Sequence, residues 1–226
     1  QAGGHVYLVG GCVRDFLLKR RSKDIDVEVH HLSFEALKEV LSPFGTVQVM
    51  GASFAVVHLS TLEGYEFALP RMEEKTGLKH QDFNIIVDPD LPLEKACARR
   101  DFTINSMLYD VETETVIDFY SGQEDLENGI LRATNKDHFS EDPLRVLRGA
   151  SFMSRYGFKM DEDTKNLCQS IVEEGGLETL SIERIYTEYC KILMGLYPSQ
   201  GFNFLRDIHG LPFYLEDLVT THQRTD

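Results

Sequence analysis

The sequence predicts an α+β protein with a mixed-sheet head at residues 1–136 and an all-α neck at residues 137–226. Short runs of β-branched and aromatic residues, separated by glycine and proline, dominate the first part and are typical of strands. Apolar residues at helical spacing dominate from Ser140 onward, with breaks at glycine or proline. We therefore expect two domains with different secondary structure.

The elements of the head follow from local signals. We expect, in chain order, a strand at 6–9, a helix at 12–21, a strand at 24–29, a helix ending at Leu41 that Ser33 caps, strands at 46–50, 55–59 and 65–69, a helix at 92–98, and a strand or hairpin at 111–119. The polar segment from Arg71 to His80 has no period and predicts a mobile loop. Ser140 is expected to cap the first neck helix, since two acids and Pro143 follow it.

Composition restricts the class of protein. Hydrophobic residues make up 42% of the chain and aromatic residues 10%, as in a globular protein, and no run of 18 apolar residues is present. The net charge of −14 argues against a surface that coats nucleic acid, so any RNA is held by local basic patches such as 19–23. That patch is equally well explained as a solvated helix end. The four cysteines are too scattered for zinc pairs and indicate a cytoplasmic protein with reduced thiols: Cys12, Cys97, Cys168 and Cys190.

A double glycine and a pair of aspartates carry the strongest chemical signal. Gly10 and Gly11 follow a buried strand and precede a helix, so backbone N–H groups can approach an anion closely. Asp24 and Asp26 lie on the next strand, and a period of two places both carboxylates on one face. Oxygen ligands of this kind select Mg²⁺, which suits in-line attack on phosphorus. Each half alone also fits a simple turn or a solvated strand edge.

Two glutamates compete for the role of a third carboxylate. Glu66 qualifies if its strand neighbours the one that carries the aspartates. Glu28 shares the face of the aspartates. The sequence does not decide between them.

Basic side chains follow the helix expected at 92–98. Arg99 and Arg100 offer guanidinium donors to a triphosphate or an RNA backbone, and Asn105 is a further candidate for nucleotide contacts. Asp101 can be interpreted structurally instead, as a helix N-cap whose carboxylate forms a salt bridge with either arginine.

Asp142, Arg145 and Arg148 occupy one helical turn and a half at the start of the neck. Cytosine and adenine both present an amino donor beside a ring-nitrogen acceptor, whereas uracil and guanine present a carbonyl beside an N–H. A carboxylate next to a guanidinium therefore accepts the first two bases and opposes the others. The alternative for Asp142 and Arg145 is an ordinary surface salt bridge at i,i+3 spacing.

These motifs together resemble the class II tRNA nucleotidyltransferase family, which comprises CCA-adding enzymes, CC-adding and A-adding relatives, and bacterial poly(A) polymerases. Five stretches carry the resemblance in the family's order: Gly10 to Asp15 with Asp24 to Asp26, Arg99 to Met107, Ser121 to Arg132, Glu141 to Gly157, and Glu183 to Ile185 with Glu188 and Lys191.

The resemblance implies a polymerase-β-like nucleotidyltransferase head in which Asp24 and Asp26 hold Mg²⁺ and Gly11 and Arg14 lie near the triphosphate. It implies addition of CMP and AMP, from CTP and ATP, to the tRNA 3′ end, and nucleotide reading that Arg148 assists. The family's body and tail regions are expected to be absent from this chain. A complete segment from Arg71 to Phe83 favours an enzyme that adds A.

Two departures from the family pattern affect these expectations. Ser151 stands where the family usually has an arginine, so one triphosphate or template contact is in doubt. Ser121-Gly122 replaces a double glycine, which alters only a turn.

Other functions stay open at this stage. A poly(A) polymerase shares every motif above, and an inactive nucleotide- or RNA-binding fragment shares most of them. A nucleotidyltransferase that modifies a small molecule or a protein is disfavoured by Asp142, Arg145 and the neck. The sequence does not determine the oligomeric state.

Overall fold

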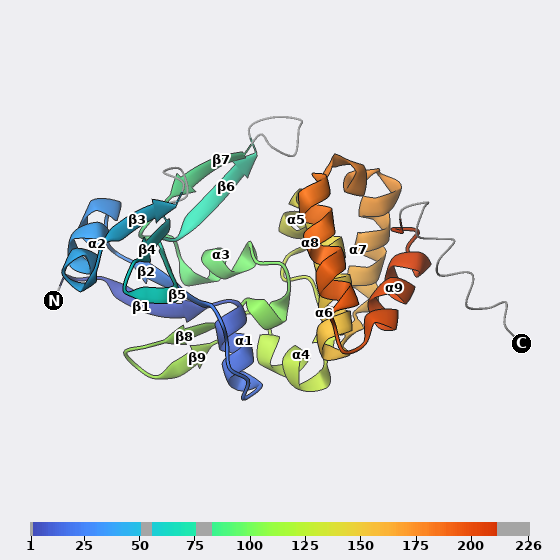
Figure 1. The fold of residues 1–226 in the computed structure, drawn as a ribbon, viewed down its shortest axis with the longest axis horizontal. Coiled ribbons are helices and arrows are strands. Elements are labelled where there is room, and N and C mark those ends of the chain that lie inside the picture. The colour runs from blue at the N-terminus through green and yellow to red at the C-terminus, as the bar shows by residue number, and fades with distance from the viewer. Residues whose placement is uncertain (1, 51–55, 76–82, 212–226) are drawn as a thin grey trace, which may run out of the picture. The chain divides into compact units, whose positions relative to one another are not determined.

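The computed structural model describes residues 2–50, 56–75 and 83–211, and it divides into two compact units, residues 1–123 and residues 124–226 (Figure 1). Each unit is described by itself. The first unit contains a seven-stranded sheet and the second is mainly helical. The boundary between a head and a neck near residue 136 stays a prediction.

The sheet of the first unit is mixed, as the sequence predicts. Its strand order is β3-β4-β5-β2-β1-β8-β9, and all neighbours are antiparallel except β2 and β5, which are parallel. The strands are β1 (His5–Val9), β2 (Ile25–His30), β3 (Val47–Met50), β4 (Val56–Leu59), β5 (Leu62–Ala68), β8 (Leu108–Asp110) and β9 (Thr115–Ile117). The last two begin and end earlier than the expected hairpin.

The two faces of the sheet have different partners. One face packs against α2 (Phe34–Leu41) through a core that contains Val27, Val29, Leu37, Val57 and Leu59. The opposite face packs against residues of α3 (Leu93–Ala98) through a smaller cluster that includes Tyr7, Val9, Cys97 and Leu108. Because side chains alternate along a strand, the carboxylates of β2 belong to this second face.

The first helix is shorter than predicted. α1 covers Gly11–Leu17 and ends where Lys19 adopts a left-handed conformation, with φ of 55°. The Arg20 N–H donates to the carbonyl of Asp15, and the Lys19 N–H donates to that of Phe16, which is the pattern of a Schellman cap. Lysine carries no sequence signal for this conformation, so helical composition alone overestimates the length.

The segment expected to be a mobile loop is partly a strand. β6 (Arg71–Lys75) pairs antiparallel with β7 (Phe83–Val87), with Arg71 opposite Val87. The prediction is wrong for residues 71–75, because pairing with the apolar β7 satisfies the backbone of a segment that has no period of its own. Residues 76–82 of the predicted loop lie outside the described residues.

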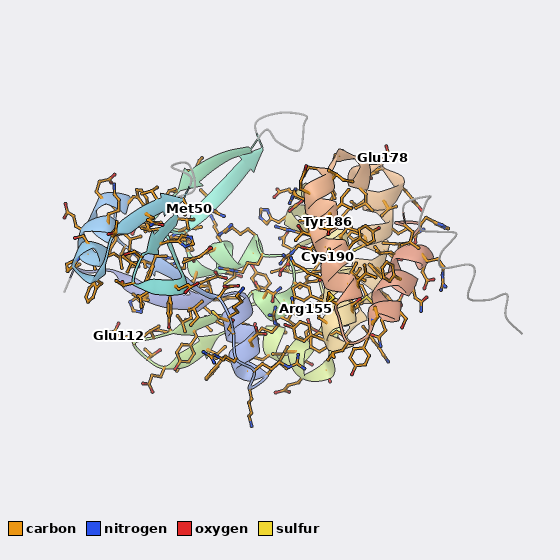
Figure 2. All side chains as sticks on the ribbon, in the orientation of Figure 1. Met50, Glu112, Arg155, Glu178, Tyr186 and Cys190 are labelled. Carbon is orange, nitrogen blue, oxygen red and sulfur yellow. The ribbon has the colours of Figure 1, made fainter. Side chains whose placement is uncertain are left out.

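The second unit is built around α6 (Leu144–Tyr156), which packs against α8 (Ile182–Leu193) and α9 (Pro198–Asp207). An ideal Cβ on Gly201 would clash with Ser154 and with the carbonyl of Ala150, so α9 approaches α6 as closely as a glycine permits. On α8, Tyr186 and Cys190 lie one turn apart (Figure 2), and Tyr186 is exposed.

The other helices of the described chain are α4 (Gly122–Asn128), α5 (Lys136–Glu141) and α7 (Glu162–Glu173). Short 3-10 turns cover Ser42–Phe44, Thr103–Asn105 and Gly176–Thr179. Two strands of two residues each, β10 (Ile130–Leu131) and β11 (Lys159–Met160), pair in parallel. β11 is a small exception to an all-α neck. In the described parts of the chain, every helix is too short or too polar to cross a membrane.

The predicted cap of the first neck helix is wrong. Ser140 lies inside α5, where its hydroxyl donates to the carbonyl of Lys136, and Asn135 caps that helix instead. The chain breaks at Asp142, because the residue before a proline disfavours the α conformation. The Asp142 carboxylate then accepts the Leu144 N–H at 3.1 Å, so it serves the start of α6.

Candidate active site

The double glycine lies at the turn between β1 and α1. Gly10 has φ of 73°, which favours glycine, and the Arg14 N–H donates to its carbonyl. An ideal Cβ on Gly10 would lie 3.1 Å from Nη1 of Arg100 and 3.5 Å from Oδ2 of Asp26. The guanidinium of Arg100 and the carboxylate of Asp26 therefore both lie close to the Gly10 backbone, which carries no side chain.

The two aspartates lie close enough for the charge of Asp24 to act on Asp26. Asp24 immediately precedes β2, and Asp26 is its second residue, directly opposite Val9 of β1. Burial raises the pKa of Asp26, the guanidinium of Arg100 lowers it, and the carboxylates of Glu66 and Asp24 raise it further, for a net increase. A divalent cation would relieve this repulsion, so the donor set fits a hard metal ion.

Glu66 lies on the strand that the third-carboxylate hypothesis requires. β5 is the parallel neighbour of β2, and Glu66 is in register with Asp26. Its side chain is half exposed and lies 3.4 Å from Nε2 of His58. Within the described residues, no three His, Cys, Asp or Glu side chains are grouped so as to hold one metal ion. The role of Glu66 therefore stays a prediction.

Glu28 is engaged in a buried network. Its Oε2 accepts from Arg100 at 3.3 Å and its Oε1 lies 3.0 Å from Nε2 of His30, and only 2% of the residue is exposed. Burial by itself raises the pKa of Glu28, but the hydrogen bond from His30 and the charges of Arg100 and Arg99 lower it below its ordinary value overall. The arrangement favours a carboxylate that positions Arg100 over one that binds a metal.

Arg14 forms the second buried network of this site. Its Nη1 donates to Oδ1 of Asn105 at 2.6 Å, and its Nε and Nη2 donate to Asp15. Asn105 donates in turn to Asp101 at 2.9 Å. An ideal Cβ on Gly11 would lie 3.4 Å from Nη2 of Arg14, so this guanidinium lies beside the double glycine. Asn105 and Asp101 hold it there.

The arginine pair lies at the C-terminal end of α3, directly after the helix, as the sequence predicts. Arg99 is the C-cap residue of α3, and the Arg100 N–H donates to the carbonyl of Cys97. Both guanidinium groups act on Glu28, and Arg100 reaches Gly10 as well. The Asp101 carboxylate accepts from the Phe102 N–H and from Asn105.

The candidate base-reading residues belong to the second unit. Both oxygens of Asp142 accept from Nη2 of Arg184 on α8, at 2.9 and 3.1 Å. Arg145 donates from Nη1 to the carbonyl of His138 at 2.7 Å. Arg148 lies over the ring of Phe152, 5.6 Å from its centroid. Asp142 is thus oriented by a residue 42 positions away, in addition to its role at the start of α6.

Three residues that contact candidate site residues were not singled out from the sequence: His30, Asp15 and Arg184. Asp15 and Arg184 lie inside stretches that carry the family resemblance, yet nothing local shows what they bond. The sequence placed Asp15 and Arg184 within motifs. A motif identifies a segment of the chain, but it does not show which residue a side chain contacts.

The chain resembles known proteins over most of its length. A family model described as poly A polymerase head domain matches residues 6–132, and one described as probable RNA and SrmB-binding site of polymerase A matches residues 157–218. A multifunctional CCA protein from Acinetobacter baylyi is 44% identical over 211 residues, and one from Stenotrophomonas maltophilia is 41% identical over 217. The matches cover 91% and 94% of this chain and 49% and 52% of the relatives, so the chain spans about half their length.

Solved structures give the same result. The Thermotoga maritima CCA-adding enzyme in complex with tRNA has a TM-score of 0.75 and 29% identity, covering 92% of this chain and 47% of that one. Complexes of a CCA-adding enzyme with CTP and with ATP have TM-scores of 0.75 and 0.72 at 30% identity. Each covers 92% of this chain and 48% of the solved one.

Proposed function

Because this chain belongs to the poly A polymerase head domain family, whose model matches residues 6–132, we propose that it is a template-independent RNA nucleotidyltransferase. Its substrates are CTP and ATP, and its acceptor is the 3′ end of tRNA, to which it adds CMP and AMP. The observation that carries the proposal is the convergence of Asp26 and Arg100 over the bare backbone of Gly10. A carboxylate for a metal and a cation for phosphate then face one anion-binding turn.

The phosphate end of the nucleotide is assigned to residues of the first unit. Backbone N–H groups at Gly10 and Gly11 and the guanidinium groups of Arg14 and Arg100 neutralise the triphosphate. The networks of Asn105 and Glu28 fix those two guanidinium groups before substrate binds. Arg99 contributes positive charge in the same region. Such preorganisation lowers the cost of ordering side chains in the transition state.

The carboxylates of Asp24 and Asp26 hold Mg²⁺, and Glu66 is the candidate third carboxylate. When bound, the ion stabilises the charge that develops as the RNA 3′-OH attacks the α-phosphate and pyrophosphate leaves. The side chains of Asp24 and Asp26 would supply hard oxygen ligands, which suit Mg²⁺.

Asp142 and Arg145 read the base. The Asp142 carboxylate accepts the amino group of cytosine or adenine, and Arg145 donates to the ring nitrogen beside it. Arg184 supports this role because its Nη2 donates to both oxygens of Asp142 and so orients the carboxylate. Arg148 assists from the next turn of α6, where Phe152 fixes its guanidinium.

CCA addition is favoured over other members of the family by the names of the relatives. The curated relatives are multifunctional CCA proteins, and solved neighbours are CCA-adding enzymes crystallised with CTP, with ATP and with tRNA. A poly(A) polymerase is the second candidate, because the matching family model carries that description. The four free cysteines favour the cytoplasm as the compartment.

The test is incubation of the chain with tRNA that lacks its 3′ terminus, Mg²⁺ and each labelled nucleotide. We expect CMP addition from CTP alone, followed by a single AMP when ATP is added, and no product in EDTA. A long homopolymeric A tail would support the poly(A) polymerase. Failure to add any nucleotide would contradict an active transferase and favour a nucleotide- or RNA-binding fragment.

A further inference from the structure

A cavity of about 550 Å³ lies in the first unit, on the face of the sheet opposite the carboxylates. Leu8 and Ile25 form part of its lining, and each alternates along its strand with a residue of the candidate active site, Val9 or Asp26. Tyr109 is in register with Leu8, and Tyr65 with Ile25. The cavity therefore shares strands with the active site but none of the residues proposed to act there.

Aromatic rings form one part of this cavity. Phe16 of α1 is 61% exposed and lies 5.6 Å from the ring of Tyr109, centroid to centroid. Tyr65 lines the same cavity from β5. An exposed phenylalanine beside two tyrosines is a suitable surface for stacking a planar base, since every base has a π-face.

Positive charge gathers at the same place. Arg20, Arg21 and Lys23 line the cavity, whereas Glu63 is its one acidic residue among the described side chains that line it. This excess stands out in a chain whose net charge is −14. Clustered cations beside aromatic rings match a phosphate attached to a base.

The segment that bears these cations is held in place. The Schellman cap of α1 fixes its beginning, and the Ser22 hydroxyl donates to the Asp24 carbonyl at 2.8 Å. Gly64 lies so close to the Lys23 carbonyl that an ideal Cβ there would be 2.9 Å away. The cations therefore extend from a fixed backbone, which reduces the entropy lost when they bind an anion.

We propose that this cavity is a second nucleotide site, in which the exposed ring of Phe16 stacks on the base, Tyr65 and the tilted ring of Tyr109 line the pocket around it, and Arg20, Arg21 and Lys23 bind the phosphate. Its volume is in the range of small-molecule sites and accommodates one nucleotide. The ligand is either a free nucleoside monophosphate or one unpaired nucleotide of an RNA strand, because both present the same base and phosphate. The proposal does not depend on the transferase activity.

Photo-crosslinking with peptide mapping tests the site without an activity readout. One arm uses 8-azido-AMP, and the other uses a short single-stranded RNA that contains 4-thiouridine. In either case we expect the labelled peptides to contain Tyr65 or Tyr109. Labelling by 8-azido-AMP would identify the ligand as a free nucleotide, and labelling by the RNA would identify it as a nucleotide of an RNA strand. Peptides that contain only Gly10–Arg14 or residues 99–105 would overturn the proposal, because they belong to the candidate active site.

Two variants test separately the aromatic surface and the positive charge of the cavity. Phe16→Ala and the pair Arg20→Ala with Arg21→Ala should each reduce labelling of these peptides about tenfold or more. The matched controls are Phe44→Ala, which removes another exposed ring, and Lys38→Ala, which removes another surface cation; both should label normally. Unchanged labelling in both cavity variants, with melting temperatures equal to wild type, would refute the site.

Discussion

Replacing Glu28 by glutamine removes one charge from the network that holds Arg100. The side chains of Glu28 and Arg100 are 3% and 17% exposed, and their closest atoms are 3.3 Å apart. Glutamine keeps the shape but removes the carboxylate charge that contacts Arg100, so that Arg100 keeps the charge of Asp26 nearby but not that of Glu28, and it weakens the contact with His30. A hydrogen bond to a charged group contributes about 1.5–3 kcal/mol, so we expect the free energy of unfolding to fall by about 2–3 kcal/mol at pH 7. For a protein of this size the melting temperature should fall by about 4–12 °C.

The pH dependence gives the sharper test. The pKa of Glu28 is lowered from 4.5 in the folded protein, so the carboxylate contributes stability above its unfolded pKa and loses it as the pH falls through the folded pKa. The difference between wild type and Glu28→Gln should therefore be full at pH 7 and shrink below about pH 4.5. Thermal unfolding followed by circular dichroism at several pH values measures it.

A control on the same unit completes the experiment. Glu39 is exposed on α2, and Glu39→Gln should change the free energy of unfolding by less than about 0.5 kcal/mol at every pH. If Glu28→Gln melts within that range at pH 7, or if its deficit is the same at pH 3.5, then Glu28 is not the ionised partner of Arg100 and the positioning role is wrong.

Three further predictions concern the proposed chemistry. Asp26→Ala should reduce nucleotide addition by several orders of magnitude while the melting temperature stays near that of wild type, and near-normal turnover would exclude a metal-binding role. Asp142→Ala should raise UTP or GTP incorporation relative to CTP, because each lost base contact costs about 1–3 kcal/mol of discrimination. Arg184→Ala should shift nucleotide selectivity in the same direction but by less. If Asp142→Ala lowers the melting temperature and leaves selectivity unchanged, Asp142 serves only the start of α6. Gly10→Ala should reduce both stability and CTP affinity, because it places a Cβ at φ of 73° and 3.1 Å from Arg100, and wild-type affinity in equilibrium binding would show that the turn does not need glycine.

Local sequence signals predicted the parts of the site that depend on few neighbours. The strand, the double glycine and the start of the helix after it are correctly placed, although the helix ends at Leu17 and not at Arg21, and the period of two correctly puts Asp26 on one face with Glu28. The Ser33 cap is confirmed, since its side chain accepts the Ala36 N–H. Errors occur where a partner distant in sequence decides: residues 71–75 form a strand only because β7 pairs with them.

The roles of individual polar residues needed the tertiary structure. From the chain alone, Glu28 and Glu66 were equal candidates for a third carboxylate. Folding buries Glu28 against Arg100 and His30, whereas Glu66 stays half exposed opposite Asp26. The contact of Glu28 with Arg100 and the register of Glu66 with Asp26 join residues far apart in sequence, which no local pattern reports.

By itself, the sequence determined that a double-glycine turn precedes a pair of carboxylates and that a helical region follows, because glycine conformation and side-chain periodicity act over a few residues. Only the tertiary structure decided which guanidinium lies over Gly10, which residue orients Asp142, and that a basic, aromatic cavity opens behind Asp26. Those features arise where strands and helices distant in sequence come together, and their energies come from burial and charge pairing that exist only in the folded chain.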